Sequence, residues 1–192
     1  DIDDNHYGGW GIYHDEASSH ILDEDNIVYR TKFAPFNIHY CKEVTVRNNI
    51  FAFGQLEQLA RGKVDPHKSV FFEGNIVYWE TGPLYAKNWK DKPYFFYTSP
   101  KREPVEWTSN FEADYNLYFN PTMPAYAADF NGRTWEEWQA AGKDKHSVWA
   151  DPLFADPSRG DFTLSENSPA LALGFRPIDL GDVGPRFRPG AQ

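Results

Sequence analysis

Two neighbouring carboxylates and one histidine form the strongest candidate site in the sequence. Asp15 and Glu16 are adjacent, and His39 follows in a short apolar segment. Paired carboxyl groups can hydrolyse a glycosidic bond, one as the acid and the other as the base or nucleophile. We expect Asp15 to be the main catalytic carboxylate and His39 to orient it or a substrate hydroxyl. Successive strand residues point to opposite faces, which would separate Glu16 from Asp15. The other choices for the second carboxylate are Glu80, Asp65 and a residue before Asp1.

Aromatic residues are frequent and favour a carbohydrate ligand. They make up 17% of the chain, with 7 Trp, 11 Tyr and 15 Phe. Aromatic rings stack on the apolar faces of sugars and leave the sugar hydroxyls free for polar partners. The alternative is that these rings only fill a wide core. The candidates for contact with a polysaccharide or oligosaccharide are Trp10, His14, Tyr40, Arg61, His67, Trp79 and Glu80. For Arg61, a solvated arginine in a polar loop is the alternative interpretation.

A repeated asparagine pattern indicates the elements that position these residues. Asn26, Asn49 and Asn75 each precede two apolar residues, and Asn116 begins a weaker copy. The spacings are 49 − 26 = 23, 75 − 49 = 26 and 116 − 75 = 41. Such a period predicts a solenoid of stacked coils. Asparagine tolerates the left-handed conformation of a sharp turn, and amides stacked about 4.8 Å apart can bond to one another. We therefore expect a ladder of asparagines.

Alternation within the second coil places the histidine on an outer wall. In the segment 36–40, Phe36 and Ile38 share one face and His39 lies on the other. If the apolar face packs inward, His39 lies one coil along from Asp15, at the distance between neighbouring strands.

The other segments are predicted to interrupt or close the coils. Residues 1–120 are interpreted as the C-terminal coils of a parallel β-helix, with an aromatic, proline-containing loop insertion at 80–109. Residues 121–192 are interpreted as a helix plus a C-terminal cap. Thr134 and Glu137 match a capping box, so one short helix is expected after Thr134.

Three motifs, besides the asparagine repeat, carry a resemblance to a known family. They comprise Gly11, Ile12, Tyr13, Asp15 and Glu16; Phe36, His39 and Tyr40; and a tail that includes Asp151, Pro152, Gly160, Asp161, Ser168 and Pro169. Together they resemble the C-terminal part of bacterial right-handed parallel β-helix proteins of the pectate-lyase-like superfamily. The resemblance is strongest to secreted glycoside hydrolases that act on fucose- or xylose-containing glycans. It implies an all-β fold, a parallel β-helix solenoid, a glycoside hydrolase activity and a secreted or periplasmic location. Asn37 stands where the family pattern has a histidine, and His14 where an apolar residue is more usual.

Two other functions are open. A polysaccharide lyase or epimerase would need a base beside a group that neutralises a uronate. A non-catalytic glycan-binding or structural β-helix would need neither, and missing N-terminal coils of the same protein are a further expected partner.

Charge and composition argue against several other classes. The net charge of −9 and the pI near 5.1 argue against nucleic acid and anionic membranes as partners. The single cysteine, Cys41, excludes an internal disulfide framework, and no Cys/His spacing suggests a metal. No apolar run reaches membrane-spanning length. We expect no cofactor and no metal.

Overall fold

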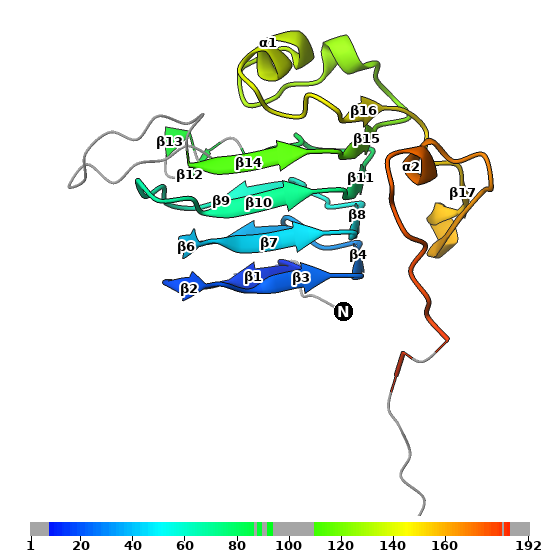
Figure 1. Cartoon of the computed structure of the whole chain (residues 1–192), viewed down its shortest axis with the longest axis horizontal. Coiled ribbons are helices and arrows are strands. Elements are labelled where there is room, and N and C mark those ends of the chain that lie inside the picture. Colours follow the sequence, from blue (N-terminus) through cyan, green and yellow to red (C-terminus); the bar gives the residue numbers. More distant parts are fainter. Residues whose placement is uncertain (1–7, 87, 90–91, 94–109, 182, 185–192) are drawn as a thin grey trace, which may run out of the picture.

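The chain folds into stacked sheets of mostly parallel strands, with two short helices (Figure 1). This computed structural model describes residues 8–86, 88–89, 92–93, 110–181 and 183–184. Equivalent strands of successive coils pair in parallel, so each coil lies directly against the next. The all-β, mainly parallel architecture predicted from the sequence is confirmed, and the arrangement is consistent with a β-helix-like fold.

Three parallel sheets run along the stack, and every coil contributes one strand to each sheet it reaches. The first sheet contains β1 (Ile12–His14), β5 (Phe36–Ile38) and β9 (Leu59–Arg61). The second contains β3 (Leu22–Glu24), β7 (Val44–Arg47), β10 (Val70–Glu73) and β14 (Phe111–Asp114). The third contains β4 (Ile27–Tyr29), β8 (Ile50–Ala52), β11 (Ile76–Tyr78), β15 (Leu117–Phe119) and β16 (Val148–Trp149). A short parallel pair joins β2 (Ser18–Ser19) to β6 (Cys41–Lys42).

The predicted asparagine ladder is confirmed. Asn26 Nδ2 donates to Asn49 Oδ1 at 2.9 Å, Asn49 Nδ2 donates to Asn75 Oδ1 at 3.0 Å, and Asn75 Nδ2 donates to Asn116 Oδ1 at 3.3 Å. Each side chain also bonds backbone groups of its own or a neighbouring coil, so the buried amides are paired at the bend between the second and third sheets.

The predicted turn conformation belongs to a different residue. The left-handed residues are those directly before the ladder, with φ of 59° at Asp25, 53° at Asn48, 63° at Gly74 and 56° at Tyr115. The ladder asparagines themselves do not have positive φ. The chain therefore bends one residue earlier than expected, and the asparagine that follows bonds the coils together.

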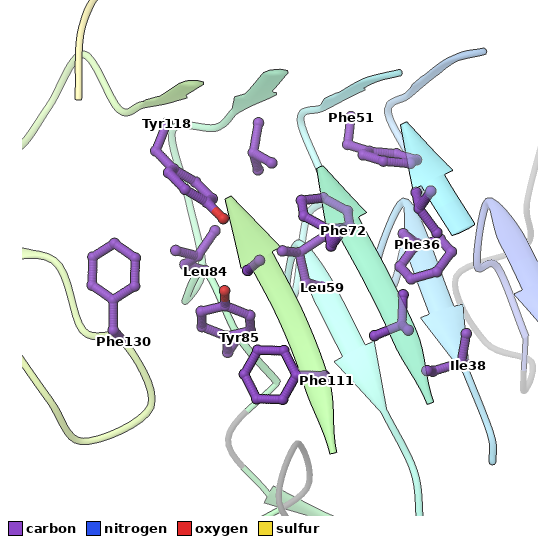
Figure 2. Close-up of a cluster of buried hydrophobic side chains, with 14 of the residues drawn as sticks. Phe36, Ile38, Phe51, Leu59, Phe72, Leu84, Tyr85, Phe111, Tyr118 and Phe130 are labelled. Carbon is purple, nitrogen blue, oxygen red and sulfur yellow. The ribbon is translucent and has the colours of Figure 1, made fainter. Parts of the chain in front are cut away.

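The core lies between the sheets, where one phenylalanine from each sheet meets the other two (Figure 2). Phe36 of β5 lies 5.6 Å from Phe51 of β8 and 6.0 Å from Phe72 of β10, measured between ring centroids. All three are buried, and burial of such a ring stabilises the fold by about 1.5–3 kcal/mol. Many of the aromatic residues noted in the sequence therefore fill the core.

The end of the stack beyond β14 and β15 is covered by residues 128–138. Phe130 and Trp138 have no exposed surface and pack against Phe111 and Tyr118 of these last strands. Trp138 lies in helix α1 (Trp135–Ala140), which follows the short 3₁₀ helix η1 (Ala125–Ala127). Thr134 and Glu137 form the predicted capping box.

The C-terminal segment covers the side of the third sheet rather than the end of the stack (Figure 1). Phe162, Ala170 and Phe175 pack on the outer side chains of β8, β11 and β15. The segment contains the antiparallel strands β17 (Phe154–Asp156) and β18 (Asp161–Leu164), the 3₁₀ helix η2 (Pro157–Arg159) and helix α2 (Pro169–Ala172).

Of the predicted insertion at 80–109, the structure describes residues 80–86, 88–89 and 92–93. Tyr85 pairs in parallel with Leu59, so residues 84–86 continue the first sheet. Two short antiparallel strands of the insertion follow, β12 (Asn88–Trp89) and β13 (Lys92–Pro93). Most of its aromatic and basic residues, and the residues 1–5 at the start of the chain, lie outside the described residues. None of the described helices is both long enough and apolar enough to cross a membrane.

Candidate functional site

His39 lies between the two predicted carboxylates. Its Nδ1 is 3.3 Å from Asp15 Oδ1, and its Nε2 is 3.7 Å from Glu16 Oε1. Asp15 and Glu16 do not point to opposite faces as expected, because they lie in the turn after β1 rather than within a strand. The backbone N–H of His39 donates to the carbonyl of His14 at 2.8 Å, which fixes the imidazole next to this turn.

Lys63 completes this group from the third coil. Its Nζ donates to Glu16 Oε1 at 3.1 Å and lies 5.3 Å from the centre of the Tyr40 ring. The carbonyl of His39 accepts a hydrogen bond from the backbone N–H of Lys63 at 2.6 Å. Asp15, Glu16, His39 and Lys63 are called the His39 cluster below.

Gly62 provides the space that His39 occupies. A Cβ added at Gly62 would lie 2.7 Å from the carbonyl oxygen of His39 and 3.0 Å from its Cδ2. Any side chain at this position would therefore displace the histidine.

The His39 cluster borders an open hollow of about 610 Å³ that is lined by Trp10, Tyr13, Asp15, Glu16 and His39. Trp10 contacts Tyr13 at 5.1 Å and stacks on Phe33 at 4.9 Å between ring centroids. The hollow thus combines an aromatic wall with two carboxylates and an imidazole, a combination that suits hydroxyl-rich ring compounds.

Solvent reaches the charged groups of the hollow to different degrees. The side chain of Asp15 is 74% exposed and that of Glu16 is 52% exposed, whereas His39 is 24% exposed. Ion pairs between such exposed groups add little to stability, so this arrangement is not explained by a need to hold the fold together.

Cys41 does not supply a nucleophile behind the hollow. Burial, together with the negative charges of Asp23 and Asp15, raises the pKa of its thiol to about 12. The thiolate would be a negligible fraction at neutral pH.

Two of the predicted ligand-binding residues are core residues instead. Arg61 has no exposed surface, because it is an inward residue of β9 rather than a loop residue. Its Nη1 donates to Ser69 Oγ and to Asn110 Oδ1, both at 2.9 Å, and burial lowers its pKa to about 9. Trp79 is 1% exposed and packs edge-on against Trp149. In this structure neither side chain reaches a surface ligand.

The remaining candidates lie apart from the hollow, except for Tyr40. Tyr40 packs at the edge of His39, with 5.9 Å between ring centroids. His14 is bonded to Asp23 at 2.6 Å and is largely buried. His67 Nε2 lies 3.1 Å from the carbonyl of Cys41, and Glu80 lines a different hollow of about 360 Å³.

Sequence reasoning missed Tyr13 and Lys63 as parts of the site. Lys63 lies one residue beyond the position equivalent to His39, because the strand register pairs His14 with Ile38 and Ile38 with Arg61. A basic residue one coil along and next to that position was the signal available in the sequence. Glu57 was also missed. Burial raises its pKa to about 7, although it does not line this hollow.

No protein-family model, curated protein or solved structure matches this chain. Among the described residues, no group of three or more His, Cys, Asp or Glu side chains is arranged to hold a metal ion.

Proposed function

We propose that this protein is a carbohydrate-active, right-handed parallel β-helix protein related to the pectate-lyase-like superfamily, and that it hydrolyses glycosidic bonds at the His39 cluster. The observation that carries the proposal is the position of His39 between Asp15 and Glu16 beside an aromatic hollow. A polysaccharide or oligosaccharide would lie along this wall. Fucose- or xylose-containing glycans are the first substrates to test, and a secreted or periplasmic location fits such substrates.

The contacts suggest different roles for the two carboxylates. Lys63 and His39 both oppose the negative charge of Glu16, which suits an ionised base or nucleophile. Asp15 contacts only His39 among the described cations, so fewer positive charges oppose its protonation, and we assign it the role of proton donor. His39 would hold Asp15 in position or carry its proton to the leaving oxygen. Trp10 and Tyr13 would stack against the sugar rings.

The test is release of reducing sugar from xylan and from a fucose-containing polysaccharide. Asp15→Asn and Glu16→Gln are each expected to lower kcat by about 10²–10⁴-fold. Trp10→Ala is expected to raise KM more than it lowers kcat. Glu166→Gln, at an exposed glutamate of the C-terminal segment, is the matched control. Unchanged hydrolysis in Asp15→Asn and Glu16→Gln would contradict the proposal.

A non-catalytic glycan-binding protein is the second candidate, because the Lys63–Glu16 ion pair of 3.1 Å already compensates one of the two carboxylates. Binding of a glycan without any cleavage, lost in Trp10→Ala but retained in Asp15→Asn, would favour this function.

A lyase or epimerase is less well supported, because Asp15 and Glu16 would repel a uronate. The formation of an unsaturated product that absorbs in the ultraviolet would indicate a lyase instead.

A further inference from the structure

A third hollow lies where the strands of the second sheet end, away from the His39 cluster. Its volume is about 300 Å³. One wall comes from the ends of the strands of the second sheet and from the corners that follow them: Glu24, Arg47, Glu73, Asn48, Gly74 and Tyr115. The other wall comes from the C-terminal segment: Leu173, Gly174 and Arg176. It is called the corner groove below.

Tyr115 is an unusual residue for its position in this groove. Equivalent corners in the other three coils carry Asp25, Asn48 and Gly74, residue types that accept positive φ at low cost. Tyr115 has φ of 56° and is 47% exposed. Positive φ is sterically unfavourable for a bulky aromatic residue. Backbone strain of this kind is concentrated at functional sites.

Asp114 and His146 support one side of Tyr115. Asp114 Oδ1 accepts hydrogen bonds from the backbone N–H of Tyr115 at 2.9 Å and of His146 at 2.7 Å. Asp114 Oδ2 lies 2.7 Å from His146 Nδ1. The imidazole of His146 stacks on the Tyr115 ring with 4.8 Å between centroids and an interplanar angle of 12°. One face of the ring is therefore supported, and its side chain still borders the groove.

Polar groups of both kinds surround this ring. Glu24 Oε1 accepts from Arg47 Nε at 2.8 Å and from Arg176 Nη2 at 2.7 Å, which leaves other N–H groups of the two guanidinium groups for a ligand. Glu73 lies beside Arg47 and Asp114 in the sheet, and its carboxylate has no hydrogen bond or ion pair to any described residue. The two glutamates balance the two arginines in charge, and Asp25, whose Oδ1 lies 3.4 Å from Arg176 Nη2, adds a further carboxylate. The groove therefore does not favour an acidic ligand.

We propose that the corner groove is a second carbohydrate-binding site, which takes a neutral sugar. The sugar ring stacks on the exposed part of Tyr115, Glu73 accepts hydrogen bonds from its hydroxyls, and Arg47 and Arg176 donate to its oxygens. The groove lies on a different sheet from the His39 cluster, and the proposal does not require hydrolysis at that cluster.

The test is calorimetric titration of the full chain with xylohexaose and cellohexaose, and with an oligogalacturonate as the charged comparison. Tyr115→Asn restores the residue type of Asn48 at the equivalent corner, so we expect about a tenfold loss of affinity with an unchanged or higher Tm. Glu73→Gln should also weaken binding, because an amide replaces one acceptor by a donor. Tyr126→Asn, at a tyrosine that is 77% exposed in η1, should leave the affinity unchanged.

A further variant distinguishes binding at the corner groove from binding at the hollow beside His39. Trp10→Ala, in the hollow beside His39, should leave the Tyr115-dependent binding intact whatever that hollow does. The proposal is overturned if the wild type binds neither neutral oligosaccharide, if Tyr115→Asn binds as tightly as the wild type, or if the oligogalacturonate binds more tightly than both. A parallel fall of affinity and Tm in Tyr115→Asn would assign Tyr115 a structural role instead.

Discussion

Asn116 Nδ2 donates a hydrogen bond to Asp144 Oδ1 at 2.9 Å, so a buried carboxylate ends the asparagine ladder. The same carboxylate accepts from Ser147 Oγ at 2.6 Å and from Trp138 Nε1 at 2.7 Å. Burial raises the pKa of Asp144, although these hydrogen bonds act in the opposite direction. The ladder and the cover formed by α1 are thus joined at a single residue.

Removal of this carboxylate should strongly destabilise the fold. We expect Asp144→Ala to lower the free energy of unfolding by about 3–5 kcal/mol, because buried N–H and O–H donors from Asn116, Trp138 and Ser147 lose their acceptor. Urea unfolding followed by tryptophan fluorescence measures this change. Glu166→Ala, at an exposed glutamate, is the control, and a loss below about 1 kcal/mol in Asp144→Ala would contradict the assignment.

Asp114 should make the stability of the fold depend on pH in the acid range. Burial raises the pKa of Asp114, but hydrogen bonds from His146 and Tyr115 outweigh this effect and lower the pKa below its ordinary value of 3.8. A carboxyl group with a lowered pKa contributes stability above 3.8, and this contribution is lost as the pH falls through the folded-state pKa. The wild type should therefore melt at a higher temperature than Asp114→Asn at pH 7.

The difference in Tm between these two proteins should shrink as the pH falls below 3.8. Thermal melts at a series of pH values measure it. The lowest pH of the series should lie about one unit below the ordinary pKa of an aspartate. If the difference in Tm is the same at this pH as at pH 7, the charge of Asp114 does not stabilise the fold.

Gly62→Ala should disrupt the His39 cluster through space rather than charge. The added Cβ would lie 2.7 Å from the His39 carbonyl oxygen, so the backbone of one coil must move. We expect a loss of about 1–3 kcal/mol of stability and a loss of glycan turnover or binding at the hollow. Gly132→Ala is the control, because nothing lies within 4 Å of its added Cβ. It carries only the backbone cost of its positive φ, which is 85°.

Arg61→Ala should affect stability and not ligand affinity. The change removes the donors to Ser69 and Asn110 and leaves a cavity beside Phe111, so we expect a loss of about 3–5 kcal/mol. Kd for an oligosaccharide, measured at a temperature where the variant is still folded, should equal that of the wild type. A changed Kd with unchanged stability would return Arg61 to the ligand-binding candidates.

The ladder was predictable from sequence because one side chain type recurs at nearly one period. Asn26, Asn49 and Asn75 repeat where each coil bends, and a buried amide that bonds its own copy leaves little freedom for substitution. The same periodicity correctly placed His39 one coil along from Asp15.

The direction of side chains in short strands was harder to predict. β1 and β9 each have three residues, so an error of one position moves a side chain between the core and the outer wall. The ends of such short strands were also misplaced: Arg61 was assigned to a polar loop although it ends β9, and Asp15 and Glu16 were assigned to a strand although β1 ends at His14. The corner groove gave no periodic signal, because Tyr115 departs from the polar or glycine residues at the equivalent corners.

The asymmetry of the stack limits how copies of this protein can associate through their strands. Residues 128–138 block one end, whereas β1, β3 and β4 have no further strand beside them among the described residues. Asn26 is the first residue of the ladder among the described residues. Its N–H groups donate to Asn49, and its Oδ1 accepts no hydrogen bond from a described residue. A filament grows only if every subunit offers two adhesive ends. The cover of residues 128–138 beyond β14 and β15 therefore prevents a filament from growing through that end of the stack.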